Sequence, residues 1–445
     1  MTQTSLAAIV MAGGLGKRMR SATPKHLHVL LGRRMVDWAL DAVLALEPDP
    51  VVVVTSPEAQ DELAGSLDGA HIAVQPEPRG TGDAVAATRP VLDGFDGDVL
   101  VVPGDAPLLT PQLLEDVLAT HRRERPALTM VTVEPDVPRA YGRVLRAPDG
   151  SVAAIVEAAD ATPEQLAITE LNASIYVFSA NDLWRSLDRL GTENAQGELY
   201  LTDAVAALVG AGRTVAAHRA SDASEADGVN TRAELAQAAA ALRDRINARH
   251  MEAGVTILDP ATAWIDAGVE LEADAVVEPF TILRGRTRVA RGASIGPHTV
   301  IVDAIVGERA TIGPFCYVRP GTVLEAGAKA GTFVEIKNST IGEGTKVPHL
   351  SYIGDADVGA GTNIAAGNIT ANVRHEDRAK QRTRIGRDVK TGIHSSLVAP
   401  VEIGDGAWIA PGSVITEDVP ADALAGFPPR QETKEGYVRA RRRRD

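Results

Sequence analysis

The sequence predicts a Rossmann-like α/β domain with a mostly parallel sheet, followed by a connecting helix and a left-handed parallel β-helix. Two observations predict this fold class. Over residues 1–230, short aliphatic runs alternate with amphipathic stretches, as in parallel sheets that are covered by helices. From about residue 255 an aliphatic residue returns at every sixth position, a spacing that neither a helix nor a single strand produces. We therefore expect a first domain over 1–230, a linker helix over 231–253, a β-helix over 254–426 and a charged tail over 427–445.

The helices and strands of the first domain follow from these local patterns. Arg34–Leu46 and Pro111–Glu124 are amphipathic and are expected to be helices that cover the sheet. Residues 231–251 contain neither Gly nor Pro, and Thr231 with Glu234 has the spacing of a capping box, which predicts the linker helix. The expected strands are Leu6–Met11, Val51–Thr55, His71–Gln75, Val99–Pro103 and Thr129–Val133.

The six-residue period predicts a coil of very short strands, with one aliphatic residue directed inward from each flat side. Gly, Pro and Asp lie between the steps, as in Ile403-Gly404-Asp405-Gly406, where the chain must turn sharply. The alternative is a set of ordinary strands that happen to be evenly spaced. The periodic residues form three runs: Ile265, Leu271, Val277, Leu283, Val289, Ile295 and Ile301; Val306, Ile312, Val318, Leu324, Ala330 and Ile336; Ile385, Thr391, Leu397, Ile403, Ile409 and Ile415.

Composition excludes several classes of function. No apolar run of the 445 residues approaches the length of a membrane-spanning helix, and no basic region precedes an apolar stretch at the N-terminus, so we expect no membrane span and no secretory signal. The single cysteine, Cys316, excludes an internal disulfide and suits a reducing cytoplasm. A net charge of −14 argues against general nucleic-acid binding, so any phosphate site must be a local basic pocket.

The first expected strand runs directly into a Gly-rich loop, Ala12-Gly13-Gly14-Leu15-Gly16. Backbone N–H groups of such a loop can approach a phosphate chain closely, although a Gly-rich loop alone is a weak indication. Arg18 and Lys25 add positive charge within a few residues, which strengthens the prediction of a phosphate site. The spacing matches neither the P-loop nor the dinucleotide fingerprint.

Two further strand ends carry candidate ligand-binding residues. Gln75 ends one strand and Gly80-Thr81-Gly82 opens the next helix, so an amide could contact a base edge there; a simple helix-capping turn is the alternative. Asp105 follows a central strand, where open α/β sheets bind ligands, and a carboxylate at that place is a candidate Mg²⁺ ligand. Taken alone, Asp105 could equally cap the following helix.

Together these motifs resemble the sugar-1-phosphate nucleotidylyltransferases. With the repeats behind them, nearly the whole chain resembles the bifunctional N-acetylglucosamine-1-phosphate uridylyltransferase / glucosamine-1-phosphate N-acetyltransferase family. The motifs that carry the resemblance are Gly-Gly-x-Gly-x-Arg-Met, Pro-Lys, Gly-Thr-Gly and Gly-Asp-x-Pro-Leu, with Tyr141-Gly142-Arg143, Ile155-Val156-Glu157, Glu170-Leu171-Asn172, residues 196–203 and Gly228-Val229-Asn230.

The resemblance implies an in-line transfer, in which a sugar phosphate oxygen attacks the α-phosphorus of UTP and pyrophosphate leaves. Catalysis of such a step consists mostly of positioning and charge neutralisation. Arg18 and Lys25 would neutralise the triphosphate as catalytic groups, and Asp105 and Asn230 would hold Mg²⁺. The other implied roles are nucleotide binding by Ala12, Gly13, Gly14, Gln75, Gly80 and Thr81, with Thr81 at the junction of the two substrates, and binding of the amino sugar by Gly142, Glu157 and Asn172.

Two departures from the family pattern lie in this half of the chain. Ala12-Gly13-Gly14 replaces the usual Ala-Ala-Gly, and Asn172-Ala173-Ser174 replaces the usual Asn-Thr-Gly. The second lies in the expected sugar pocket, so the identity of the N-acyl sugar stays open, as does the choice between UTP and dTTP.

The periodic half also contains polar residues that a plain structural coil does not require. A lone His on a coil is more often incidental, but His349 lies three residues before Tyr352, with a basic pair upstream. These segments resemble the acetyltransferase half of the same family, with a site on the outside of the coil, typically between the chains of a homotrimer. The implied roles are general base for His349, sugar-phosphate binding by Arg319 and Lys337, sugar binding by Tyr352 and Asn363, acetyl-CoA binding by Asn372, and orientation of His349 by Glu335.

Departures in this half leave two other hypotheses open. Val373 and Arg374 replace Tyr-Asp of the bacterial pattern, and Ile393 and Pro411 replace small residues beside the expected acetyl-CoA groove. One alternative is a monofunctional hexose-1-phosphate nucleotidylyltransferase using UTP or dTTP, with the β-helix as an oligomerisation scaffold. Another is a regulatory protein like the subunits of the eukaryotic translation-initiation exchange factor, although Lys25 and Asp105 count against it. The run Arg441–Arg444 is either a solvated end or a phosphate contact.

Overall fold

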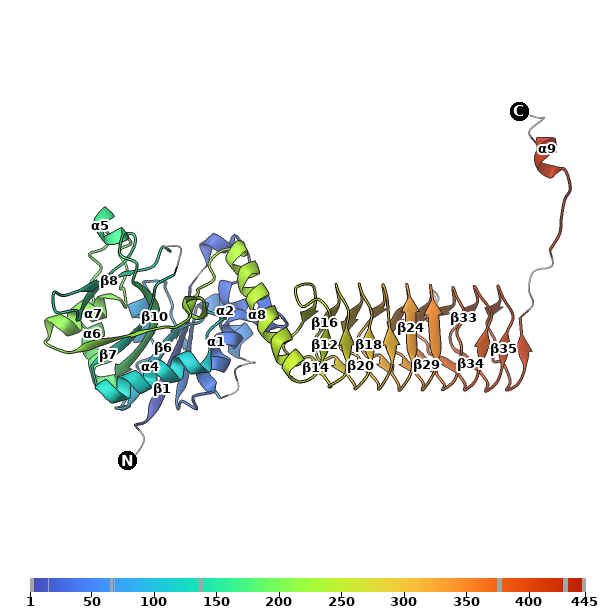
Figure 1. The fold of residues 1–445 in the computed structure, drawn as a ribbon, viewed down its shortest axis with the longest axis horizontal. Coiled ribbons are helices and arrows are strands. Elements are labelled where there is room, and N and C mark those ends of the chain that lie inside the picture. The colour runs from blue at the N-terminus through green and yellow to red at the C-terminus, as the bar shows by residue number, and fades with distance from the viewer. Residues whose placement is uncertain are drawn as a thin grey trace. The chain divides into compact units, whose positions relative to one another are not determined.

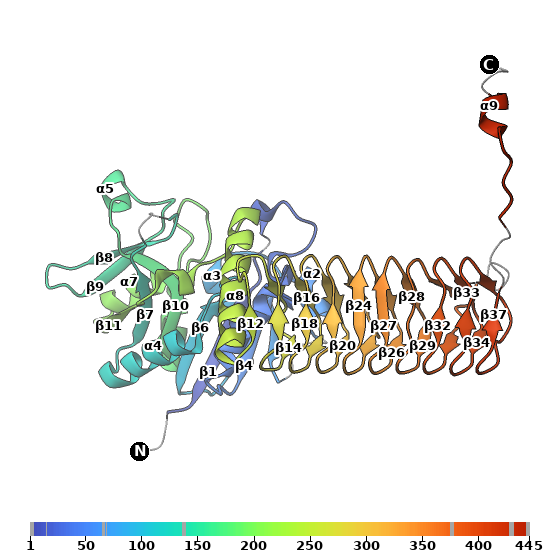
Figure 2. The same ribbon diagram turned by 45° about the vertical axis from the view of Figure 1, so that its right-hand side comes forward.

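The computed structural model describes residues 4–14, 16–64, 67, 69–135, 139–373, 378–426 and 431–441. The chain divides into two compact units, Met1–Leu242 and Arg243–Asp445. The first unit contains a sheet with helices, and the second is a stack of short strands (Figures 1 and 2). These two architectures confirm the predicted fold class.

The first unit is built on one nine-stranded sheet, whose main path has the order β11-β7-β10-β6-β1-β4-β5. The neighbours β6-β1, β1-β4, β4-β5 and β11-β7 pair in parallel, and β10 runs antiparallel to both β6 and β7. The sheet is therefore mostly parallel, as predicted. Its strands are β1 (Leu6–Ala12), β4 (Val51–Thr55), β5 (His71–Val74), β6 (Asp98–Pro103), β7 (Leu128–Val133), β8 (Arg143–Arg146), β9 (Val152–Val156), β10 (Leu171–Ser179) and β11 (Val215–Arg219), and a hairpin of β2 (Val29–Leu30) and β3 (Arg33–Arg34) lies outside it.

Helices cover both faces of this sheet, which explains why its central strands are continuous apolar runs. Successive residues of a strand point to opposite faces: Val10 and Val53 belong to one buried cluster, and Ile9 and Val52 belong to the other. The helical segments are α1 (Met35–Leu44), α2 (Pro57–Ala64), α3 (Thr81–Ala86), α4 (Pro111–Glu124), α5 (Pro163–Leu166), α6 (Ala180–Leu187) and α7 (Asp203–Gly210), with 3₁₀ turns η1 (Lys17–Met19), η2 (Lys25–Leu27) and η3 (Ala223–Ala226).

Helix α8 covers Arg232–Glu252, where the sequence predicted the linker helix. Its first turn has the expected capping box, because Thr231 N–H donates to Glu234 Oε2 at 2.7 Å and Glu234 N–H donates to Thr231 Oγ1 at 3.2 Å. The helix is followed by Gly254, whose φ of +92° few other residues adopt at low cost. No helix in the described ranges is long and apolar enough to cross a membrane.

The second unit is a β-helix with three flat faces, and neighbouring strands on each face pair in parallel about one coil apart. Face one consists of β12 (Thr256–Ile257), β15 (Val276–Val277), β18 (Ser294–Ile295), β21 (Thr311–Ile312), β24 (Lys329–Thr332), β27 (Lys346–His349), then β32 (Lys390–Thr391), β35 (Trp408–Ile409) and β37 (Leu424–Ala425). Face two consists of β13 (Trp264–Ile265), β16 (Ile282–Arg284), β19 (Val300–Val302), β22 (Tyr317–Val318), β25 (Glu335–Lys337), β28 (Tyr352–Gly354), β30 (Ile369–Ala371), β33 (Ser396–Val398) and β36 (Val414–Ile415). Face three consists of β14 (Glu270–Leu271), β17 (Arg288–Val289), β20 (Ile305–Val306), β23 (Val323–Leu324), β26 (Thr340–Ile341), β29 (Ala356–Val358), β31 (Thr383–Ile385) and β34 (Val401–Ile403).

The periodic aliphatic residues fill the interior of this coil. All of them are buried except Leu271, which is half-buried near the start of the coil. The prediction that each six-residue step forms one side of a prism is therefore confirmed. Of the expected charged tail, the structure describes residues 431–441 with the short helix α9 (Tyr437–Arg441), and Arg442, Arg443 and Arg444 lie outside the described residues.

Candidate active site

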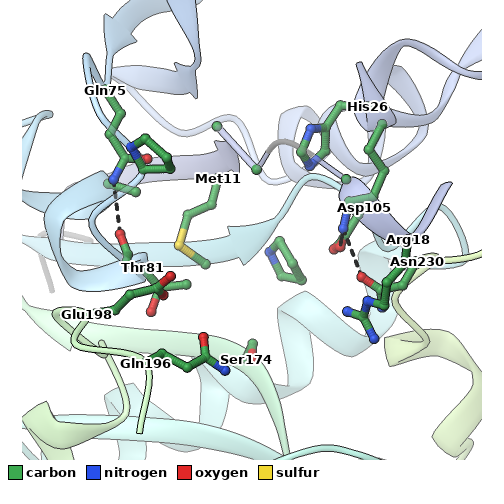
Figure 3. A pocket seen from close by; sticks show the side chains of 18 residues that line it. Met11, Arg18, His26, Gln75, Thr81, Asp105, Ser174, Gln196, Glu198 and Asn230 are labelled. Carbon is green, nitrogen blue, oxygen red and sulfur yellow. Dashed lines mark hydrogen bonds and ion pairs between the residues drawn. The ribbon is translucent and has the colours of Figure 1, made fainter. Parts of the chain in front are cut away.

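The carboxyl ends of the parallel strands bring the candidate residues of the first unit together. Strands β1, β5 and β6 end next to Gly13, Gln75 and Asp105, and adjacent parallel strands place these ends on one edge of the sheet. A cavity of about 560 Å³ opens at this edge (Figure 3). Its wall includes Gly13, Gly14, Arg18, Lys25, Gln75, Gly80, Thr81, Asp105 and Asn230. The structure thus gathers most of the residues that the sequence singled out.

The Gly-rich loop lies close to its neighbours. A Cβ on Gly13 would lie 2.9 Å from Gln75 Oε1, and a Cβ on Gly16, whose φ is +61°, would lie 2.6 Å from Lys25 Cβ. A side chain at either position would push into residues that line the cavity. Ala12 differs from its neighbours, since it is buried in the end of β1 and does not line the cavity.

Gln75 is held in one orientation by the turn that follows it. Its side-chain Nε2 donates to the Gly80 carbonyl at 3.0 Å and to Asp83 Oδ2 at 2.9 Å. The amide oxygen accepts no hydrogen bond from another described residue. The Gln75 side chain is buried in the cavity wall, so this free acceptor is available to a ligand.

Residues 80–82 pack tightly against the segment that precedes α7. Gly80 has a φ of +112°, and a Cβ there would lie 2.5 Å from the Leu199 carbonyl oxygen. Thr81 Oγ1 accepts from Leu201 N–H at 2.9 Å, and Gly82 N–H donates to the Leu199 carbonyl at 2.8 Å. Contacts with Leu199 and Leu201, which are distant in sequence, therefore hold the start of α3 in place.

Lys25 joins the two candidate metal ligands. Its ammonium forms a close ion pair with Asp105 Oδ2 and donates to Asn230 Oδ1 at 3.0 Å. Burial alone would raise the pKa of the Asp105 carboxyl, but the charge and hydrogen bond of Lys25 hold that pKa below its usual range. Burial lowers the pKa of neighbouring His26 to about 4, so this imidazole is neutral at pH 7. The oxygens of Asp105 and Asn230 thus converge on a single cation.

Asp105 and Asn230 could together hold a divalent cation at this place. No three His, Cys, Asp or Glu side chains within the described ranges cluster as a metal site. The protein therefore offers one carboxylate and one amide oxygen, and Mg²⁺ is commonly bound in this way, by few protein ligands together with water and phosphate oxygens. Arg18, with an exposed side chain, lies on the rim of the same cavity.

A second cavity of about 320 Å³ adjoins the first and shares Arg18, Thr81, Asp105 and Asn230 with it. Thr81 thus lies in the wall of both cavities. The wall of the second cavity also contains Tyr141, Ser174, Tyr200 and the expected sugar-binding residues Gly142, Glu157 and Asn172.

The polar residues of the second cavity are held by specific contacts. Glu157 Oε1 accepts from Thr202 Oγ1 at 3.1 Å, and burial, followed by the charges of Asp203 and Asp160, raises the pKa of its carboxyl. Asn172 donates from Nδ2 to Tyr176 Oη at 2.7 Å. These bonds hold the side chains of Glu157 and Asn172 in place in the cavity wall.

Ser174 is one of the two residues at which the sugar pocket departs from the family pattern. The residue has a φ of +59° at a bulge in β10, between Asn172 and Tyr176, and its backbone N–H donates to Asn172 Oδ1 at 3.2 Å. A left-handed conformation favours the glycine that the family usually has here. Ser174 keeps the conformation and adds a side chain that lines both cavities.

Several residues that line these cavities were not singled out from the sequence. Tyr200 is buried beside the second cavity, and its hydroxyl has no hydrogen-bond partner in the described part of the chain. Burial raises the pKa of this hydroxyl to about 12, so it stays protonated and can donate to a ligand. The signal for it was present, because Tyr200 lies within a motif of the resemblance. Further unassigned residues in the cavity walls include Met11, His26, Pro78, Gln196 and Glu198.

The second unit brings part of its predicted set together on face two. Glu335 and Tyr352 occupy the same register position on neighbouring strands, and Arg319 donates from Nη1 to Glu335 Oε1 at 2.8 Å. Asn372 Nδ2 lies 3.4 Å from Tyr352 Oη. Lys337, two residues after Glu335 on β25, lies in register with Gly354 on β28.

His349 and Asn363 lie on face one instead. His349 ends β27, its side chain is exposed, and its imidazole has no partner among the described residues. Glu335, the residue expected to orient it, is bonded to Arg319. Asn363 lies in register with Lys346, three positions before His349 on the strand. Val373 and Ile393 are exposed, whereas Arg374 falls outside the described residues.

Comparison with known proteins covers almost the entire chain. Residues 8–207 match a family model described as a MobA-like NTP transferase domain. The chain is 45% identical to a protein of Mycolicibacterium vanbaalenii over 98% of this chain and 93% of the relative, and 46% identical to one of Mycolicibacterium gilvum over 98% and 92%. It is also 45% identical to a protein of Mycobacterium tuberculosis strain H37Ra over 98% and 92%. Each relative is named "Bifunctional protein GlmU".

Proposed function

Because the chain belongs to the family of bifunctional GlmU proteins, we propose that it synthesises UDP-N-acetylglucosamine in two transfers. The acetyl group of acetyl-CoA passes to glucosamine-1-phosphate, and the uridylyl group of UTP then passes to N-acetylglucosamine-1-phosphate with release of pyrophosphate. The predicted family and the predicted class of enzyme, a transferase, are confirmed by the matches to relatives and to the NTP transferase model.

The observation that carries the uridylyl transfer is the pair of adjoining cavities that meet at Asp105 and Thr81. The first accommodates a nucleotide: the free Gln75 amide oxygen accepts the N3–H of uracil, and the backbone of Gly13 and Gly14 approaches the phosphates. The second accommodates the amino sugar, whose hydroxyls donate to Glu157. An oxygen on the sugar phosphate then faces the α-phosphorus at the junction, which is the arrangement that an in-line displacement requires.

The charges at the junction serve this displacement. Asp105 and Asn230 would hold Mg²⁺, which when bound neutralises phosphate oxygens. Lys25 and Arg18 supply fixed positive charge against the triphosphate and the leaving pyrophosphate. Gly142 and Asn172 position the sugar, so the protein contributes placement and charge and forms no covalent intermediate.

For the acetyl transfer we propose His349 as the general base. Its exposed imidazole has no carboxylate partner among the described residues, and it takes the proton from the sugar amine as the amine attacks the thioester carbonyl. The C–S bond of the thioester then breaks, and CoA leaves as the thiolate. Arg319 and Lys337 bind the sugar phosphate, and Tyr352 and Asn363 bind the sugar. Asn372 contacts acetyl-CoA.

We further propose a cytoplasmic homotrimer that assembles through the β-helix. Phe280, His298, Phe315 and Phe333 form an exposed ladder along one corner, with successive ring centroids 4.7, 4.8 and 5.3 Å apart. An apolar strip of this kind is typical of a protein–protein contact. The domain boundaries that we propose remain 1–230, 231–253, 254–426 and 427–445.

Separate assays of the two half-reactions test this proposal. Asp105→Ala is expected to abolish pyrophosphate release from UTP while acetyl transfer persists, and His349→Ala is expected to do the reverse, because the residues lie in different compact units. Loss of both activities in either variant would contradict the assignment. If the wild-type chain makes the sugar nucleotide but releases no CoA with glucosamine-1-phosphate, the monofunctional alternative, which the exposed Val373 and Ile393 favour, would replace it.

A further inference from the structure

Face one of the β-helix bears a line of lysines that ends at a tryptophan. Five residues occupy the same register position on successive coils of this face. They are, in order, Lys329, Lys346, Asn363, Lys390 and Trp408. The strands that carry the lysines, β24, β27 and β32, lie in this order along the second unit, with Asn363 between β27 and β32 (Figure 2). All five side chains are exposed.

The lysines of this line have no counter-ion in the described part of the chain. Lys329, Lys346 and Lys390 form no ion pair or hydrogen bond through their ammonium groups with any described residue, although the chain has a net charge of −14. Lys329 and Lys346 occupy adjacent register positions, where like charges repel each other. A ligand with several negative charges would remove this repulsion.

Trp408 is the exposed member of the four tryptophans. Trp38, Trp184 and Trp264 are half-buried, whereas Trp408 is 54% exposed. Lys390 Nζ lies 5.3 Å from the centroid of its ring. An exposed aromatic ring beside an unpaired ammonium is a suitable surface for a nucleobase that carries phosphates, because every base has a face that stacks on aromatic rings.

We propose that Trp408 and Lys390 bind the adenine nucleotide end of acetyl-CoA, with adenine stacked on the indole and a phosphate at the ammonium. This inference rests on the proposed acetyl transfer. Strand β27, which ends in His349, is separated from β35 by the positions of Asn363 and β32. Three strand steps of about 4.8 Å place Trp408 about 14 Å along the coil from the base. That span suits a donor whose thioester and nucleobase are joined by a long arm.

Kinetics of the full-length protein with two acetyl donors test the assignment. Trp408→Ala is expected to raise the KM for acetyl-CoA by about tenfold, as stacking contributions imply, and to leave kcat within twofold. With S-acetylpantetheine, which lacks the nucleotide, kcat/KM should stay within twofold of wild type. Lys390→Ala should show the same selectivity for acetyl-CoA, and Trp408→Phe should retain most of the affinity.

Val414→Ala is the matched control, because Val414 is 67% exposed on neighbouring face two and should affect neither donor. The inference is overturned if Trp408→Ala leaves the KM for acetyl-CoA unchanged, impairs both donors equally, or dissociates the oligomer in light scattering. Each of these results leaves the proposed acetyl transfer standing. Failure of the wild-type chain to use either donor would instead overturn that transfer and this inference together.

Discussion

Single and double variants of Lys25 and Asp105 can separate what this ion pair contributes to stability from what the two residues contribute to catalysis. Their side chains are 9% and 18% exposed, so solvent screens the pair little. Removing one partner leaves an uncompensated charge in the cavity wall, which in buried pairs costs about 3–5 kcal/mol. Replacing both partners by apolar residues of similar volume is often neutral. We therefore expect Lys25→Met and Asp105→Leu each to lower the free energy of unfolding of the first unit by about 3 kcal/mol, and the double variant to recover most of the loss.

Urea unfolding of the full-length chain without ligands measures these free energies. Replacing Trp264 and Trp408 by Phe leaves only Trp38 and Trp184 as tryptophan reporters, and both lie in the first unit. Pyrophosphate release from UTP should be lost in all three variants, because recovery of stability does not restore the metal ligand or the cation. A double variant as unstable as the two single variants together would refute the argument, and so would single variants within about 1 kcal/mol of wild type.

The pH dependence of this stability has a definite sign. The pKa of Asp105 is lower in the folded protein than in the unfolded chain, so its contribution is fully present above the ordinary aspartate pKa of about 3.9. That contribution is lost as the pH falls below this value towards the folded pKa. The stability difference between wild type and Asp105→Leu should therefore be constant near neutral pH and shrink in acid. A difference that grew in acid would contradict the ion-pair explanation.

Three further results are expected. Glu157→Gln should raise the melting temperature at pH 7, because burial raises the pKa of the Glu157 carboxyl and its ionised form therefore opposes folding above that pKa. This gain in melting temperature should vanish in acid. The KM for the sugar phosphate should rise about tenfold in steady-state assays. Gly80→Ala should weaken UTP binding in calorimetry and destabilise the fold by about 1–3 kcal/mol, because Ala at a φ of +112° would be strained and its Cβ would meet the Leu199 carbonyl. Chelation of Mg²⁺ with EDTA should abolish pyrophosphate release while CoA release, which depends on His349, continues.

The sequence was sufficient for features that local patterns determine. The inward residues of the β-helix could be predicted because each six-residue step repeats the same environment, and only Leu271 is less than fully buried. The capping box of Thr231 and Glu234 and the bounds of α4 also depend on a few neighbouring residues. Asp105 could be placed near Gly13 because parallel strands end at one edge of a sheet.

Other features depend on contacts between distant segments and could not be derived from patterns. The contact of Lys25 with both Asp105 and Asn230 spans up to 205 positions of sequence. The fixed orientation of Gln75 could be resolved only once Gly80 and Asp83 were placed. The exposed line of lysines on face one was also missed, because its members lie about one coil apart and look like isolated surface residues in the sequence.

The two compact units of this acidic chain differ in how their positive charges are arranged to bind anions. An acidic chain must attract anions through local groups, and in the first unit the cation Lys25 is buried and already paired with oxygens that a metal would use. A phosphate that binds there must rearrange the neutral Lys25–Asp105 ion pair. This site therefore favours selective binding of its ligand over attraction of anions from a distance. The lysines of face one are exposed and form no ion pair with any residue that the structure describes, so their attraction acts at a distance and is screened by salt. Anion recognition in the second unit should therefore depend on ionic strength more steeply than nucleotide recognition in the first, because burial protects only the Lys25 site from screening.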